Sequence, residues 1–516
     1  MDLTGRPRSL WARAALMAGR DVTLGNLMDR LAAIHGSRVM VEEAGGGAGR
    51  GGGRRITFAE ASRRVAEMAG WIGRATEPGD RVVLALPNNY DVVLACLAAC
   101  RAGAVPVPLN AELTEAEIDL VTADAGATVV VRDPGEMSGP PGGAPVAAQA
   151  SDVAAIFYTS GTTGRPKGAR LTHRALLGPM RSGVLYPGAV RRDEMVFGLP
   201  LSHIMGFIAV VGAAVAGIPV YFLPRFRPDA ALDAIESRRA TMFVGVPAMY
   251  RLMLEAGAEQ RVLRSVRVWA SGADAMPAEL AARFRRMGAT ATLPVLGRSL
   301  GQAAFIEGYG MVETGGGVMF KAALPFIPLP GGGDLGVPIP PNRLRVVGED
   351  GNDVAPGQTG ELWVKGPGIL AGYHGDPAAT AAVITEDGWL RTGDMARRGA
   401  FGLVQLAGRE KDVIKRGGYS VYAVEVEGAL EEHPGVAEAA VVGMHDERLG
   451  QVPVAAVRRT PGTTVTVDEL AGWARERLAA YKVPARFVFV DELPRTGTSK
   501  VRREAVKAQL LHCPPQ

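Results

Sequence analysis

Short apolar runs alternate with longer, helix-like stretches through much of the N-terminal sequence. The runs are rich in valine and are bounded by glycine, proline or charged residues, which is typical of buried β-strands. Residues 90–101 and 229–239 have the length and apolar spacing of helices. This alternation predicts an α/β architecture with largely parallel sheets. The expected strands are residues 81–86, 104–108, 128–131, 153–157, 241–246 and 265–270.

The pattern changes near residue 335, where short strands separated by glycine and proline turns become frequent. Three such segments, residues 342–347, 361–365 and 402–406, predict a small β-barrel or β-subdomain. Beyond Gly408 the sequence predicts a compact α+β region, with helices at 424–432 and 467–480 and a strand at 439–442. We therefore expect a large N-terminal domain, residues 1–409, and a small C-terminal domain, residues 410–516.

Composition excludes several classes of protein. The chain has 516 residues, 47% of them hydrophobic, and a net charge of +4 with dispersed basic residues, so it is expected to be globular and not to bind nucleic acid. Three cysteines do not form a disulfide framework. The longest apolar run, Phe207 to Leu223, contains Pro219 and is short for a membrane span. We expect a soluble, cytoplasmic protein.

The stretch Tyr158 to Gly168, YTSGTTGRPKG, concentrates hydroxyls, glycines and one lysine directly after an apolar strand. Small residues expose backbone N–H groups that can form an anion-binding nest, and lysine adds a charge suited to phosphate. The spacing differs from that of a P-loop, because Gly168 stands where serine or threonine would follow the lysine. The composition of this stretch fits either a phosphate cradle or a glycine-rich surface turn.

Several ordered motifs resolve that choice, because together they resemble the adenylate-forming (ANL) superfamily of acyl-CoA synthetases, adenylation domains and luciferases over about residues 55–505. The resemblance implies a fold with two α/β sheet subdomains and a small β-barrel in the N-terminal domain, and a mobile α+β C-terminal domain. It also identifies YTSGTTGRPKG as the loop around the β- and γ-phosphates of ATP. The implied phosphate contacts are Thr159, Ser160, Gly161, Thr162, Thr163, Gly164 and Lys167.

Further motifs imply the rest of the nucleotide site. Ser271–Pro277 resembles the loop beside adenine, with Ala273 and Asp274 in contact, and the family's Y-G-x-T-E motif matches GYGMVET, residues 308–314. Here Tyr309 would stack on adenine and Glu313 would hold Mg²⁺, an oxygen ligand suited to a hard cation. Val312 stands where the family has threonine, and it lacks the hydroxyl that is expected to contact the α-phosphate. Asp394 of RTGD and Arg409 of GREKD would bind the ribose, with Leu390 replacing the aromatic residue before RTGD.

Three catalytic residues follow from the same resemblance: Glu313, His203 and Lys500. His203 lies in PLSHIMG and would stand beside the reacting carboxylate. Lys500 ends PRTGTSK and aligns with the catalytic lysine, although Ser499 replaces the usual glycine. The acyl pocket would be lined near His203, Gly245, Gly308 and Gly315.

The implied reaction joins a carboxylate to AMP, releases pyrophosphate, and then transfers the acyl group to a thiol. Coenzyme A is the expected acceptor, with rotation of the C-terminal domain about the hinge Lys411 and a pantetheine tunnel at Gly417 and Gly418. The cofactors are thus ATP, Mg²⁺ and coenzyme A. Two alternatives remain at this point: an enzyme that loads a carrier-protein thiol, and a weakly active nucleotide-binding homologue favoured by Val312 and Ser499.

The small residues near Gly308 favour a medium- or long-chain fatty acid, and an aryl or sterol-type acid would also fit. A small dicarboxylate is disfavoured, because Gly308 supplies no cation before the Y-G motif. Residues 293–305 form a longer segment than the family usually has, and this segment is a candidate for reshaping the wall of the acyl pocket near Gly308. A homodimer is an open possibility that the sequence does not decide.

Overall fold

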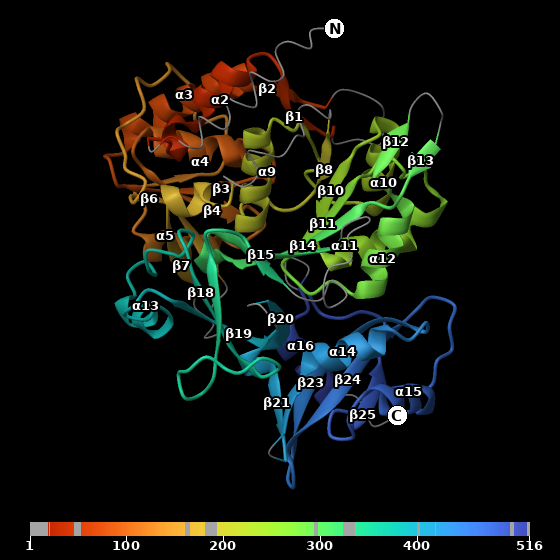
Figure 1. The fold of residues 1–516 in the computed structure, drawn as a ribbon. Helices are drawn as coiled ribbons and strands as arrows, with labels where there is room; N and C mark the ends of the chain where they lie inside the picture. Colours follow the sequence, from red (N-terminus) through yellow and green to blue (C-terminus); the bar gives the residue numbers. More distant parts are fainter. Residues whose placement is uncertain are drawn as a thin grey trace.

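The computed structural model describes residues 19, 21–45, 53–159, 166–180, 193–293, 298–323, 336–399, 403–417, 419–495 and 500–512. Figure 1 shows a large N-terminal part, coloured red to green, above a smaller C-terminal part in blue. This mixed α/β organisation agrees with the predicted fold class.

Within the part of the chain that the structure describes, the largest sheet has nine strands and forms the frame of the N-terminal part (Figure 1). Its inner strands are parallel, as the alternation of strands and helices predicts, whereas β15–β14, β16–β15 and β1–β2 are antiparallel. The strand order is β16 (Val337–Pro338), β15 (Gly316–Ala323), β14 (Ala304–Met311), β11 (Val268–Gly272), β10 (Met242–Gly245), β8 (Met195–Phe197), β9 (Val220–Phe222), β1 (Val39–Glu43) and β2 (Arg55–Thr57).

Helices α10 (Pro228–Arg238), α11 (Pro247–Glu255) and α12 (Ala278–Met287) cover one face of this sheet. Their packing centres on aromatic side chains: Tyr250 of α11 contacts the rings of Phe243, Phe284 and Phe305 at centroid distances of 5.4, 4.8 and 5.4 Å. The Tyr250 hydroxyl is also satisfied, because it donates to the Ala270 carbonyl at 2.7 Å. These contacts fix one face of α11 against the sheet, and the opposite face of α11 points outward.

A second sheet of three parallel strands, β4 (Val105–Asn110), β3 (Arg81–Leu86) and β5 (Val129–Val131), lies beside the first. Helices α2 (Leu24–His35), α3 (Phe58–Ala75), α4 (Asp91–Arg101) and α5 (Glu115–Ala125) pack around it, and α9 (Ile204–Ala216) shares the same core. Helices α3 and α5 begin with capping boxes, in the sequences T-F-A-E and T-E-A-E. In each, the side chains of the N-cap threonine and of the glutamate three residues later accept hydrogen bonds from each other's backbone N–H groups.

The predicted β-rich region is a four-stranded antiparallel sheet in the part of the chain that the structure describes. Its order is β17 (Arg343–Val347), β18 (Thr359–Lys365), β19 (Leu390–Arg398) and β20 (Val404–Arg409). The short helix α13 (Pro377–Val383) lies between β18 and β19 in the sequence. A small apolar cluster joins this sheet to β15.

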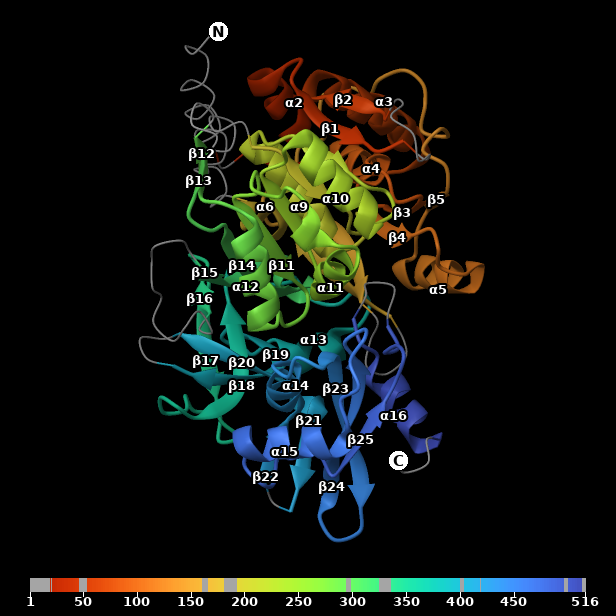
Figure 2. The same cartoon turned by 90° about the vertical axis from the view of Figure 1, so that its right-hand side faces the viewer.

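The C-terminal part has its own sheet and core. A 3₁₀ turn at Glu410–Asp412 separates β20 from β21 (Val413–Arg416), and β21 belongs to a different sheet. The sheet order is β22 (Tyr419–Tyr422), β21, β24 (Gly450–Arg459) and β23 (Val436–Asp446), with β25 (Arg486–Phe489) parallel to β24. Helices α14 (Ala423–Glu431), α15 (Val467–Arg477) and α16 (Arg503–His512) pack on it (Figure 2).

Part of the segment 293–305, which is longer than the family usually has, belongs to two short paired strands at the edge of the molecule. Strands β12 (Ala291–Leu293) and β13 (Arg298–Leu300) pair with each other and lie beside the start of β14, as Figure 1 shows. Tyr309 is near the other end of β14, so these two strands lie beside the start of β14 and not beside the Y-G motif. No helix among the described residues is both long enough and apolar enough to cross a membrane.

The backbone turns sharply where β11 ends. Ala273 has a φ of +69°, in the left-handed region, and among described residues other than glycine only Arg239 also has a positive φ. An L-residue with a Cβ pays roughly 1–2 kcal/mol for this conformation. The turn is therefore strained at a residue that the sequence places beside adenine.

Replacing Ala273 with glycine should relieve this strain. We expect Ala273→Gly to raise the free energy of unfolding by about 0.5–1 kcal/mol, once the larger unfolded-state entropy of glycine is subtracted. Denaturant unfolding without nucleotide measures the change. Ala275→Gly in the same loop is the control, because Ala275 has no positive φ and should only lose stability. Equal effects of the two substitutions would contradict the explanation.

Candidate active site

The predicted phosphate loop connects the two strands of an antiparallel hairpin, β6 (Val153–Thr159) and β7 (Lys167–Thr172). Thr159 faces Lys167 across the hairpin, and its hydroxyl donates to the Lys167 carbonyl at 3.5 Å. Both therefore stand at the mouth of the loop. Its other predicted contacts, Ser160, Gly161, Thr162, Thr163 and Gly164, lie outside the described residues.

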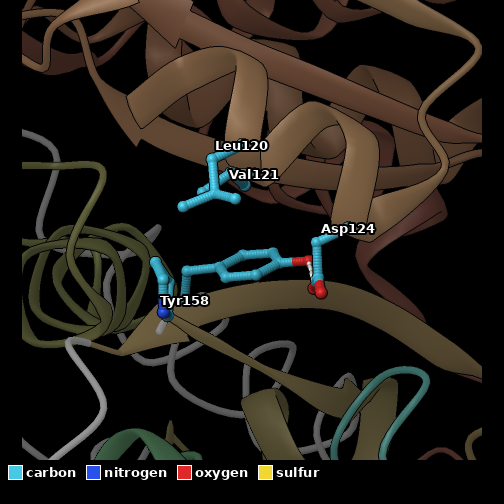
Figure 3. A pocket seen from close by; sticks show the side chains of 5 residues that line it. Leu120, Val121, Asp124 and Tyr158 are labelled. Carbon is cyan, nitrogen blue, oxygen red and sulfur yellow. Dashed lines mark hydrogen bonds between the residues drawn. The ribbon is translucent and has the colours of Figure 1, made fainter. Parts of the chain in front are cut away.

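The base of this loop is tethered to α5, which the sequence did not indicate. The Tyr158 hydroxyl donates to Asp124 Oδ2 at 2.6 Å, and burial raises the pKa of Tyr158, so the phenol stays a donor. Figure 3 shows the two side chains bordering a small hollow with Leu120 and Val121. None of the residues that line the hollow is a predicted catalytic residue, so it is a packing feature between α5 and β6.

The predicted ribose site is built by the pairing of β19 with β20. Asp394 lies opposite Arg409 in the register, and Arg409 Nε is 3.3 Å from Asp394 Oδ1. The Tyr309 hydroxyl, from β14, donates to Asp394 Oδ2 at 2.6 Å. Burial raises the pKa of Asp394, while Arg409, Tyr309 and Lys500 oppose that shift. A carboxylate has about four lone-pair positions, so Asp394 can still accept ribose hydroxyls.

Glu313 stands in a 3₁₀ turn, Val312–Thr314, directly after β14. Its Oε1 accepts a hydrogen bond from the Tyr373 hydroxyl at 2.9 Å, and the Lys167 ammonium lies 5.4 Å from the centre of the Tyr373 ring. Tyr373 thus joins the predicted metal ligand to the phosphate-loop lysine. Sequence reasoning missed it because a single tyrosine before a turn carries no signal.

The surroundings of Glu313 fit a magnesium ion carried by nucleotide. Mg²⁺ is usually held by one or two carboxylates together with phosphates and water rather than by a protein cage. Tyr373 occupies one of the two Glu313 oxygens, which leaves lone pairs for a cation. The described residues contain no group of three or more histidine, cysteine, aspartate or glutamate side chains arranged as a metal site. Val312, beside Glu313, is buried in the apolar core.

Lys500 comes from the C-terminal part but lies among residues of the N-terminal part. Burial and the charge of Arg409 lower its pKa, and the carboxylates Asp274, Asp394 and Glu313 act in the opposite direction. The stem of its loop is closed by a β-bridge between Arg495 and Val501, and by a bond of 2.8 Å from the Arg502 N–H to the Pro494 carbonyl. The structure therefore brings the predicted lysine, ribose and metal residues together.

His203 is the N-cap of α9, and this position fixes the orientation of its ring. Its Nδ1 accepts from the Met205 N–H at 3.3 Å, so the neutral ring carries its proton on Nε2. Burial lowers the pKa of His203 to about 4, and the charge of Lys500 contributes. At neutral pH the side chain is thus an uncharged Nε2–H donor within electrostatic range of Lys500.

The predicted acyl-pocket glycines differ in what surrounds them. A Cβ at Gly245 would lie 2.9 Å from the Phe243 ring, and one at Gly315 would lie 2.8 Å from the Ala175 carbonyl, at a φ of +63°. Close packing explains these two glycines. At Gly308 the nearest atom would be 3.9 Å away, so this residue borders open space.

The predicted coenzyme A residues and hinge lie elsewhere. Gly417 is in the exposed turn between β21 and β22, where its N–H donates to the Leu449 carbonyl at 2.8 Å, and Gly418 lies outside the described residues. Lys411 is exposed in the 3₁₀ turn where the chain passes from one sheet to the next. In the structure Lys500, and not Gly417, is beside the predicted nucleotide residues.

Comparison with known proteins agrees with this geometry. The AMP-binding enzyme family matches residues 28–374, and the AMP-binding enzyme C-terminal domain matches residues 425–500. A feruloyl-CoA synthase of Amycolatopsis is 37% identical over 481 residues, which cover 89% of this chain and 94% of the relative. A long-chain-fatty-acid–CoA ligase of Bacillus subtilis is 36% identical over 361 residues, covering 68% of this chain and 61% of the relative.

A solved structure of similar fold is the o-succinylbenzoate CoA synthetase of Bacillus subtilis with its acyl-adenylate intermediate. It superimposes with a TM-score of 0.79 at 28% identity, covering 93% of this chain and 98% of that structure. The same protein has been solved with ATP and a magnesium ion. The chain therefore belongs to the AMP-binding enzyme family and is an acyl-CoA ligase of the adenylate-forming superfamily.

Proposed function

We propose that this acyl-CoA ligase activates an aryl-substituted carboxylic acid, and that the structure represents the arrangement for the first of two half-reactions. The observation that supports the assignment to the first half-reaction is the position of Lys500. This residue of the C-terminal part interacts electrostatically with Asp394, Glu313 and His203 of the N-terminal part. A cation in that place suits the step in which negative charge moves between phosphates.

In the first half-reaction a carboxylate oxygen of the acid bonds to the α-phosphorus of ATP, and the bond to pyrophosphate breaks. The carboxylate is already a nucleophile, so positioning and charge neutralisation provide the catalysis. Lys500 stabilises the charge at the reacting phosphate, Asp394 and Arg409 hold the ribose, and His203 Nε2–H donates to the acid. Mg²⁺, held on Glu313, would neutralise charge on the departing phosphates.

In the second half-reaction the thiol sulfur of coenzyme A bonds to the acyl carbon, the bond to AMP breaks, and the thiol proton leaves. We propose a rotation of residues 410–516 about Lys411 between the two steps, as the family resemblance implies. The rotation would withdraw Lys500 and bring Gly417 and Gly418 to a pantetheine tunnel. Such domain movements complete a site only for the step that needs it.

The acid is the part of the function for which sequence and comparisons point in different directions. The sequence favoured a medium- or long-chain fatty acid, whereas a relative that covers most of the chain acts on the aryl acid ferulate. Open space at Gly308 suits a flat ring, and Met205 Cε lies 3.1 Å from where a Cβ on the adjacent Gly272 would be, so a thioether borders this region. We therefore place an aryl acid first.

Steady-state kinetics with ferulate, cinnamate, octanoate, palmitate and malonate tests the acid class. We expect kcat/KM for the aryl acids to exceed that for octanoate at least tenfold, with acyl-CoA as product. Gly308→Leu should raise KM for the aryl acid without changing KM for ATP, because it fills the open space. Preference for palmitate would overturn the aryl class but not the ligase activity. Acyl transfer only to a carrier-protein thiol would overturn coenzyme A as acceptor.

Lys500→Ala should separate the two half-reactions. Removing the charge should slow pyrophosphate release by about two to three decades, since preorganised charge stabilisation is worth that much. Formation of acyl-CoA from supplied acyl-adenylate should stay within about twofold, measured under single turnover. Lys507→Ala, on α16, is the control and should affect neither step. Equal losses in both steps would contradict the assignment of Lys500 to adenylation alone.

Val312→Thr should raise the adenylation rate, because it restores a hydroxyl next to Glu313 with little change of volume. A hydrogen bond to a charged group is worth roughly 1.5–3 kcal/mol, or one to two decades in rate. Single-turnover pyrophosphate release at saturating ATP measures the effect, and acyl-CoA formation from supplied acyl-adenylate should not change. An unchanged or lower adenylation rate would show that the site no longer uses that hydroxyl.

A further inference from the structure

A network of charged side chains crosses the contact between the two parts of the protein, away from the nucleotide residues. It starts on α11, whose outer face is directed at α14 and β23 (Figures 1 and 2). Arg251 of α11 lies 2.8 Å from Glu431 and 3.1 Å from Glu438, both in the C-terminal part. One turn further along α11, Glu255 lies 2.8 Å from Arg458.

Glu438 connects this contact to the loop that carries Lys500. Its side chain is only 3% exposed, and both of its oxygens accept from Arg495 Nη2, at 2.7 and 2.6 Å. Arg495 forms the β-bridge with Val501 that closes the Lys500 loop. One buried carboxylate is therefore shared by Arg251 on the N-terminal side and by the stem of the catalytic loop.

The energetics of the network depend on the docking of the two parts. Glu431 and Glu438 are like charges in a buried place, and burial raises the pKa of Glu431 to about 7, while Arg251 opposes that shift. Arg251 is the partner that the N-terminal part supplies to both carboxylates, whereas Arg495 and Arg458 contact Glu438 from within the C-terminal part. Moving the C-terminal part away from α11 would separate Arg251 from both carboxylates and Glu255 from Arg458.

We propose that Arg251 and Glu438 are positioning residues for adenylation: the docking of α11 on Glu438 holds the Arg495–Val501 stem and so places Lys500. The network favours the arrangement with Lys500 at the nucleotide site and is broken when the C-terminal part rotates for thioester formation. The inference rests on the two-step mechanism proposed above. It adds residues that touch neither substrate nor nucleotide but select between the two steps.

Arg251→Met tests the proposal, because it keeps the length of the side chain and removes the charge. We expect pyrophosphate release in the absence of coenzyme A to slow at least tenfold, and acyl-CoA formation from supplied acyl-adenylate to stay within twofold. Arg251→Lys should recover part of the adenylation rate. The matched control is Arg283→Met, which removes an arginine lying 2.8 Å from Glu259 within the N-terminal part, and it should change neither rate. Equal losses in both steps, or no loss in adenylation, would overturn the proposal.

A second variant and an activity-independent readout keep the test decisive. Glu255→Gln breaks the other ion pair at an exposed position, so it serves if Arg251→Met does not fold. It should slow adenylation selectively. Dyes on Val262→Cys and Glu447→Cys, in a Cys513→Ser background, report the distance between the two parts by energy transfer. With MgATP, Arg251→Met should shift the distance distribution away from that of the parent, and Arg283→Met should not. An unchanged distribution would overturn the proposal.

These readouts also separate the inference from the proposed function. A parent enzyme that forms no acyl-adenylate with any acid of the panel would refute the proposed substrate class, whereas the energy-transfer result would still decide whether Arg251 holds the docked arrangement. A parent enzyme active in both steps, with an Arg251→Met variant equally active in both, would refute the inference and leave the function standing.

Discussion

The structure depends on one electrostatic constraint: a partly buried lysine of the C-terminal part lies among charged groups of the N-terminal part. Burial and Arg409 disfavour the charge of Lys500, and the carboxylates Asp274, Asp394 and Glu313 compensate. Those carboxylates come from the ends of β11 and β14 and from β19. The large sheet and the smaller antiparallel sheet must therefore hold their positions relative to each other before the lysine can enter.

The C-terminal part supports the same constraint from its own side. Arg503 begins α16, three residues after Lys500, and pairs with Glu427 at 2.9 Å and with Asp412 at 3.3 Å. Asp412 follows Lys411 in the turn that joins the two sheets. The Lys500 loop is thus tied to this turn through Arg503 and to α11 through Glu438, so a rotation at the turn necessarily moves the lysine.

Much of the site was predictable from sequence because its motifs are local. The structure brings Tyr309, Asp394 and Arg409 together, and places Glu313 and Lys500 in the same electrostatic environment. Tyr373, the Tyr158–Asp124 tether and the Arg251–Glu438 contact could not be predicted, since each joins residues far apart in sequence with no pattern of their own. Of the fold, the strands and helices followed from periodicity, whereas the order of nine strands depends on long-range pairing.

The departures from the family pattern have physical consequences that can be separated. Ala273, where the family's S-G-G-A-P-[LM]-P loop has glycine, adopts a left-handed backbone that is unfavourable for an L-residue, and Val312, in place of threonine, removes a donor but fits the apolar core. Asp274 acts differently, because its charge reaches Lys500 and Arg503. A carboxylate in that loop favours the charged form of the lysine in the arrangement that the structure describes. Under the two-step mechanism proposed above, Asp274 would favour the arrangement with Lys500 beside the predicted nucleotide residues, whereas Val312 would act on the adenylation step.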